Sequence, residues 1–188
     1  LPTYSASEKL NWLIGFTRIG LFSITYILTG SLDLFRGSLV AIVSVLSAKA
    51  IARKKQAADL LFNSRGDEEL QKGLRALAKM HDDGNTNMRA FAAKSRVDED
   101  IPKMIRYVLN HYEYVAVGVQ SKIYDEGMLR SASFNTVINL YKHSKPFIEA
   151  VRDNNQRPTI YQEFQWLAKR WEEKGLPVKK RPPVWKFW

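Results

Sequence analysis

The first 52 residues of the chain are nearly free of charge, and this feature constrains the fold more than any other. They hold six charged side chains, whereas most of the 29 Lys and Arg and the 19 Asp and Glu residues come later. Two apolar stretches lie within this region, at about residues 10–31 and 34–52. A helix needs roughly 20 apolar residues to cross the core of a bilayer. We therefore expect residues 1–52 to form a membrane anchor, built as a transmembrane helical hairpin.

Two other arrangements fit the same apolar stretches. The second stretch reaches the length of a span only if it begins near Leu34 and if Lys49 extends toward the lipid headgroups. A single span beside a helix that lies along the interface is therefore one alternative. The other alternative is a buried hairpin inside a soluble helical bundle.

Small residues in the second stretch favour a membrane. They recur at spacings of four, three and four, which places them on one face of a helix: Gly37, Ala41, Ser44 and Ala48. In lipid, a stripe of small residues lets two helix backbones approach closely. We expect this stripe to mediate helix packing within the bilayer.

The charged residues near these stretches predict an orientation. Arg53, Lys54 and Lys55 follow the second stretch directly, and cations at the end of a span stay on the cytoplasmic side, near anionic headgroups. The remainder of the chain should then be cytoplasmic. Arg18 lies inside the first stretch, where a charge is costly. It either lines a pore or pairs with another subunit, or it lies near one interface.

Residues 53–174 show the periodicity of an all-α bundle, with no alternating pattern typical of strands. The strongest apolar stripe begins at Ile101 and continues to Val119 at helical spacing. Four polar residues beside this stripe are our candidates for a polar network inside the bundle: Asn110, Glu113, Tyr124 and Asp125. We expect helix boundaries at residues 64–67, 82–85, 98–100, 125–126, 146 and 157–159, and a short helix over 86–94.

The last segment, residues 175–188, has a different composition. The segment contains three prolines and four cations and ends in a run of aromatic and basic residues, and prolines favour an extended arm. Aromatic residues interleaved with lysine suit a headgroup layer, a groove on a partner, or a nucleic-acid strand. The arm folding back on its own bundle is the alternative. In each case Trp185, Phe187 and Trp188 should dock the tail.

The sequence offers little catalytic chemistry. It contains no cysteine, which excludes thiolate nucleophiles and Cys-ligated metals. Its histidines, at positions 81, 111 and 143, lack the spacing of metal ligands, and no phosphate-binding glycine loop occurs. We therefore expect a non-enzymatic protein with no cofactor and no metal. The net charge of +10 suits anionic lipid or nucleic acid, and a membrane anchor favours lipid.

Several blocks of the chain, taken in order, resemble a known family. They are Leu109-Asn110-His111-Tyr112-Glu113, Val115 to Val119, Ile123 to Glu126, Lys145 to Ile148, and Arg157 to Tyr161 followed by Trp166-Leu167-Ala168. From about Ala48 to Trp171 the chain is similar to a bacterial and phage family termed domain of unknown function 4760. The resemblance implies an N-terminal membrane segment, a basic juxtamembrane stretch and a helical cytoplasmic domain. One span is usual in that family, and it carries no known reaction or catalytic residues.

Together these features predict a protein anchored in the bacterial inner membrane, whose cytoplasmic helical domain mediates protein–protein association. Its expected partners are the bilayer and either further copies of the chain or a larger membrane complex. By analogy, it is an accessory subunit or a phage exclusion or defence factor. The alternatives are a pore-forming membrane effector and a soluble, basic, helical module that binds nucleic acid.

Overall fold

The computed structural model describes residues 38–84 and 86–176, and this part of the chain is entirely helical, without strands. The prediction of an all-α fold is confirmed. The chain divides into two compact units, Leu1–Lys49 and Ala50–Trp188. The first described helix covers residues 38–66, so its N-terminal part belongs to the first unit and its C-terminal part to the second.

The predicted membrane spans fall partly or wholly outside the described residues. The stretch over 10–31 lies entirely outside, and the stretch over 34–52 is described only from residue 38. Within the described ranges, each helix is either too short or too polar to cross a membrane. The helix over 38–66 is apolar at its start, but it becomes strongly charged after residue 52.

Local signals in the sequence explain where the next helix begins and ends. Helix α2 (Glu68–Asp82) starts after Asp67, whose side chain accepts a hydrogen bond from the backbone N–H of Leu70 at 2.9 Å. Such an N-cap stabilises a helix, and the acidic residues of the first turn complement its dipole. The helix is followed by Gly84, whose φ of +63° is readily accessible only to glycine.

Two short 3₁₀ helices connect α2 to the central helix. They are η1 (Met88–Ala92) and η2 (Lys94–Arg96), and they replace the single short helix that we expected over 86–94. Helix α3 (Asp100–Gln120) then begins with Pro102 in its first turn, where proline is tolerated.

Helix α4 (Glu126–Asn155) corrects one expectation, because the predicted break at Pro146 does not occur. The helix departs from helical geometry at Ser133 instead, with φ −130° and ψ 15°. Proline inside a helix costs about 3 kcal/mol. Burial of four side chains beyond it offsets this cost, namely Phe147, Ile148, Ala150 and Val151. Helix α5 (Gln162–Lys174) follows after a turn.

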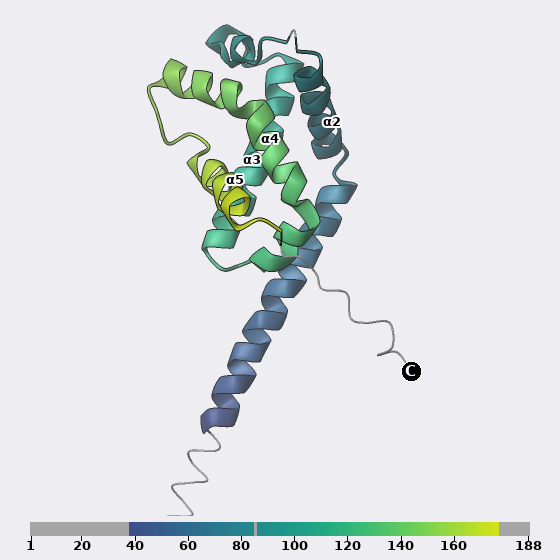
Figure 1. Ribbon diagram of the computed structural model, residues 1–188, viewed down its shortest axis with the longest axis vertical. Coiled ribbons are helices and arrows are strands. Elements are labelled where there is room, and N and C mark those ends of the chain that lie inside the picture. The colour runs from purple at the N-terminus through teal and green to yellow at the C-terminus, as the bar shows by residue number, and fades with distance from the viewer. Residues whose placement is uncertain (1–37, 85, 177–188) are drawn as a thin grey trace, which may run out of the picture. The chain divides into compact units, whose positions relative to one another are not determined.

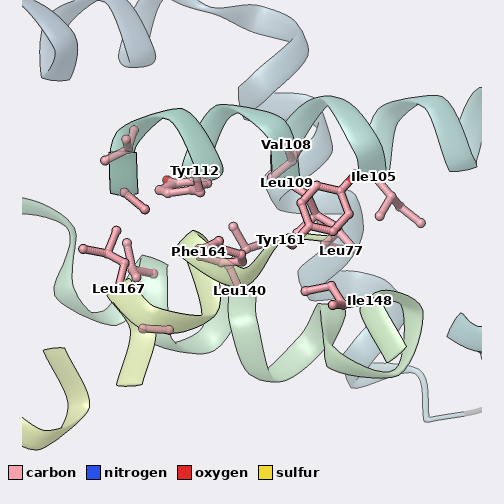
Figure 2. Packing of buried hydrophobic residues seen from close by; sticks show 14 of the residues in the cluster. Leu77, Ile105, Val108, Leu109, Tyr112, Leu140, Ile148, Tyr161, Phe164 and Leu167 are labelled. Atoms are coloured by element: carbon pink, nitrogen blue, oxygen red, sulfur yellow. The ribbon is translucent and has the colours of Figure 1, made fainter. Parts of the chain in front are cut away.

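In the second unit, α3 lies at the centre and contacts α2, α4 and α5 (Figure 1). Figure 2 shows the result: Ile105, Val108, Leu109 and Tyr112 of α3 face Leu140 and Ile148 of α4 and Phe164 and Leu167 of α5. The first helix adds Ala57, which is fully buried, and Leu60 and Leu61, which pack against the core. Residues 50–66 are therefore part of this bundle.

Candidate functional site

The beginning of the first helix exposes its apolar side chains. Each of the large apolar residues of this segment is between 53% and 68% exposed: Leu39, Val40, Ile42, Val43, Val45, Leu46 and Ile51. Successive residues of a helix are rotated by about 100°, so side chains at these positions point to every side. Exposed apolar surface of this extent marks a site of contact with another protein or with a membrane. We call residues 38–51 the apolar segment.

The predicted small-residue stripe lies in the apolar segment. Ala41, Ser44 and Ala48 are helical and exposed, and their spacing of three and four places them on one face. Gly37, the fourth member of the stripe, lies outside the described residues. The three described positions thus present a narrow strip where a second helix backbone has room to approach.

The predicted basic stretch directly follows the apolar segment. Lys54 and Lys55 are exposed and Arg53 is half-buried. None of the three forms an ion pair with any residue in the described ranges. Their charges are therefore available to an anionic partner. Two turns of helix separate the exposed Ile51 from the buried Ala57 and the bundle core.

Several other predicted site residues cannot be placed. Arg18, the predicted intramembrane charge, lies outside the described residues, and so do the tail residues Trp185, Phe187 and Trp188. Of the tail segment, Gly175 and Leu176 are described. Gly175 has a φ of +63° and ends α5.

The structure does not bring the four polar candidates of the bundle into one network. Asn110 is exposed on α3, and the ring of Tyr124 packs against the core beside Gly118. The side chain of Asp125 caps α4 by accepting from the backbone N–H of Met128 at 2.7 Å. Glu113 alone joins two helices. These side chains share proximity to the α3 stripe, but helical geometry directs them to different faces of the bundle.

Glu113 stabilises the start of α5 from α3. Its carboxylate accepts hydrogen bonds from the backbone N–H groups of Phe164, at 2.7 Å, and Glu163, at 3.4 Å. These N–H groups lie in the first turn of α5, where a helix leaves donors without partners. Tyr161, which precedes this helix, has a φ of 57° and supplies no side-chain cap. Partial burial raises the pKa of Glu113, and the backbone hydrogen bonds oppose this shift. Its role is structural.

A polar cluster that the sequence did not reveal joins the first helix, α2 and α3. Ser64 Oγ lies 3.2 Å from His111 Nε2, and the Tyr107 hydroxyl donates to Asp67 at 2.7 Å. Burial lowers the pKa of His111, and the nearby Asp67 carboxylate opposes this effect. The pKa of Asp67 itself is lowered, first by the hydrogen bond from the Leu70 backbone. No periodic signal links Ser64 to His111, because 47 residues separate them.

The Ser64–His111 pair lacks the geometry of a hydrolase. Ser64 Oγ donates its proton to the carbonyl of Leu60 at 2.7 Å, so it accepts from His111 Nε2–H. A nucleophilic serine needs the reverse arrangement, in which Nε2 accepts the serine proton. The adjacent cavity, lined in part by Ser133 and Trp171, has a volume of about 30 Å³. It has room for about one water molecule, far less than a substrate requires.

The described residues also hold no metal-ligand cluster of three or more His, Asp or Glu side chains. His81 of α2 and His143 of α4 do meet, with ring centroids 3.9 Å apart and an angle of 14° between the rings. This is a stacked pair. It joins two helices that no spacing pattern in the sequence relates.

The fold and the exposed surface define a class: an all-α helical protein whose first described helix begins with an exposed apolar segment and a basic stretch. Within this class, the chain belongs to the family described as Domain of unknown function (DUF4760), which matches residues 34–171. The resemblance drawn from the sequence blocks is thereby confirmed, and the match extends upstream of Ala48 to include the apolar segment. No curated protein and no solved structure matches the chain significantly.

Proposed function

We propose that the chain is a membrane-anchored, non-enzymatic protein whose helical domain, residues 53–174, associates with further copies of itself or with another membrane protein. The observation that carries the proposal is the exposed apolar segment. A helix whose apolar residues point to every side has no single face for a soluble core, so it needs an apolar environment around it. Lipid, or other helices within lipid, provides that environment.

The boundary of the segment supports an anchoring role. The continuous run of exposed apolar side chains ends at Ile51, although Phe62 further along the same helix is also exposed, and Arg53, Lys54 and Lys55 follow the run without ion-pair partners in the described ranges. Cations at this position interact with anionic headgroups by about 1 kcal/mol each and set the orientation. We place the helical domain on the cytoplasmic side of the inner membrane for this reason.

The extent of the family match adds a second argument. The match begins at residue 34, so the apolar segment belongs to the family domain, whereas residues 10–31 precede it. The described apolar part, residues 38–52, would span about 22 Å at 1.5 Å per residue. A bilayer core is about 30 Å thick. The proposed anchor therefore also includes residues before 38.

Extraction of membranes with alkaline carbonate tests the anchoring. The wild-type chain should stay in the membrane pellet. Val43→Glu/Leu46→Glu should shift it toward the soluble fraction, because each charge placed in a bilayer costs about 2.5–3.5 kcal/mol. Gln56→Glu/Asn63→Glu is the matched control, since it adds the same two charges at exposed polar positions of the same helix.

Two results would count against the anchor. If carbonate extracts the wild-type chain completely, the membrane proposal is wrong. If the Val43/Leu46 variant stays in the membrane pellet as fully as the control does, the apolar segment does not lie in lipid. Another part of the chain then anchors the protein in the membrane.

Mass measurement in mild detergent tests the association. The wild-type chain should run as an oligomer or with a partner, and Ala41→Leu/Ala48→Leu should weaken the assembly by blocking the close approach of a second helix. Val40→Leu is the control, because it changes an exposed position that is already large. A wild-type chain that runs alone at the mass of one copy would contradict the proposal.

A further inference from the structure

An open groove of about 480 Å³ lies in the second unit, between the first helix and the start of α4. Its apolar lining comes from Leu61 of the first helix and from Gly127, Met128 and Ala132 of α4. Met128 is 37% exposed. The groove is shallow, and Lys54, Asp125 and Ser131 also line it, so it suits a short segment laid along its surface.

Helix α5 ends beside the start of α4, where this groove lies. Lys174, its last residue, places Nζ 3.1 Å from Glu126 Oε1, and Arg170 binds the same carboxylate at 2.8 Å. Glu126 immediately precedes the groove residue Gly127. The described chain ends at the exposed Leu176, two residues after Lys174, which contacts the residue that precedes the groove.

We propose that the C-terminal segment, residues 177–188, folds back and seats Trp185, Phe187 and Trp188 in this groove. Nine residues lead from Leu176 to Trp185, and an extended chain of that length reaches about 30 Å. The segment contains Pro177, Pro182 and Pro183, which favour an extended form that loses little entropy on docking.

The covalent connection favours this occupant over a separate partner. A short tether raises the effective concentration of the aromatic residues at the groove to the order of millimolar. Aromatic side chains also bury more apolar area than the other residues of the segment. The docked segment would cover apolar surface that otherwise faces solvent.

The absence of cysteine from the chain allows a direct test by disulfide trapping. Ser131→Cys places a thiol in the groove, and Lys186→Cys places the other between the proposed aromatic anchors. The control pair, Ser95→Cys with Lys186→Cys, uses an exposed residue of η2, whose neighbour η1 packs against the other end of α4 through Ala92 and Asn154. Both pairs are made in the full-length chain and oxidised with oxidised glutathione.

The groove pair should form an intrachain disulfide about tenfold faster than the control pair, because docking raises the effective thiol concentration. Adding Met128→Glu should reduce that rate to the control value. Glutamate suits the first turn of α4, so this change leaves the helix itself intact. Circular dichroism checks that each variant is folded.

Three results would overturn the proposal. Equal rates for the two pairs would show that the segment does not prefer the groove. A disulfide that forms only between chains would assign the groove to a second copy. Loss of the fast intrachain reaction when vesicles of anionic lipid are present at the natural protein-to-lipid ratio would assign the segment to the headgroup layer. Failure of the anchoring experiment leaves the trapping result unaffected, because the groove lies wholly in the helical domain.

Discussion

Glu113 of α3 caps the first turn of α5, with its carboxylate 2.7 Å from the backbone nitrogen of Phe164. This contact joins two residues that lie 51 positions apart in the sequence, and it satisfies a donor that α5 cannot satisfy itself. Phe164 is fully buried, so the cap also holds a core side chain in place.

Substitutions of Glu113 should distinguish the contribution of its hydrogen bonds to stability from the contribution of its charge. Glu113→Ala should lower the free energy of unfolding by about 1–2 kcal/mol, since two backbone donors lose their acceptor. Glu113→Gln should cost much less, because the amide oxygen still accepts and burial already disfavours the charged carboxylate. Urea titration of both variants measures the difference. Equal losses would mean that the charge, not the hydrogen bond, stabilises this junction.

Glycine at position 118 is required by the ring of Tyr124. A Cβ atom at Gly118 would overlap that ring, and the Gly118 carbonyl also accepts from the backbone N–H of Ile123 at 2.9 Å. Gly118→Ala should therefore destabilise the fold by about 1–3 kcal/mol. Gly66→Ala is the control, since open space surrounds that position and alanine favours a helix. A thermal melt in which both variants match the wild type would contradict this packing.

Local sequence signals predicted much of this fold. The helix boundaries expected at residues 64–67, 82–85 and 125–126, and the end of the helical domain at residue 174, all follow from residue types that act within a few positions. The spacing of apolar residues predicted the core face of α3 for the same reason. The helix break predicted at Pro146 was wrong. The rule that proline ends a helix is local, whereas the buried side chains of α4 beyond Pro146 stabilise the continuous helix.

The candidate site was predictable only where it depends on composition. The apolar segment and the basic stretch are continuous in the sequence, so they could be recognised directly. The contacts from Ser64 to His111 and from His81 to His143 each join distant helices, and no spacing rule relates such residues. Asn110, Glu113, Tyr124 and Asp125 were grouped because they lie beside one apolar stripe, and the structure places each of them in a different local arrangement.

Acidification should destabilise the bundle through its half-buried histidines, His111 and His143. Burial lowers the pKa of His111, and burial together with the stacked His81 lowers the pKa of His143, with Asp82 opposing. Both values start from 6.5 in the unfolded chain, so the unfolded chain takes up protons first as the pH falls. The free energy of unfolding should have its full value above pH of about 7. It should decrease as the pH falls through 6.5 toward the lowered pKa values of the two histidines in the folded chain.

Urea midpoints at pH 7.5 and pH 5.5 measure this dependence, because ordinary histidines titrate between these two values. His143→Gln should make the difference between the two midpoints smaller, because it removes one of the two lowered groups. Lys142→Gln is the neighbouring control at an exposed position. A wild-type midpoint that rises on acidification would contradict the sign of the effect.

The contact of Arg170 with Glu126 should be a stabilising ion pair between α5 and α4. Arg170 approaches both carboxylate oxygens, with Nε at 2.8 Å from Oε1 and Nη2 at 3.1 Å from Oε2. This bidentate geometry lowers the pKa of Glu126, so its contribution is present above pH of about 4.5 and is lost as the pH falls below that value. Because both side chains are partly exposed, we expect a coupling of about 0.5–1 kcal/mol.

A double-mutant cycle with Glu126→Gln and Arg170→Met measures that coupling at pH 7, and 1 M NaCl should reduce it only in part, since the Glu126 side chain is 23% exposed. The Lys72–Glu69 pair on α2 is the control. Its side chains are 56% and 70% exposed, so its coupling should be close to zero. If the two cycles give equal values, the α5–α4 contact is an ordinary surface pair, and it does not fix the end of α5 beside the groove.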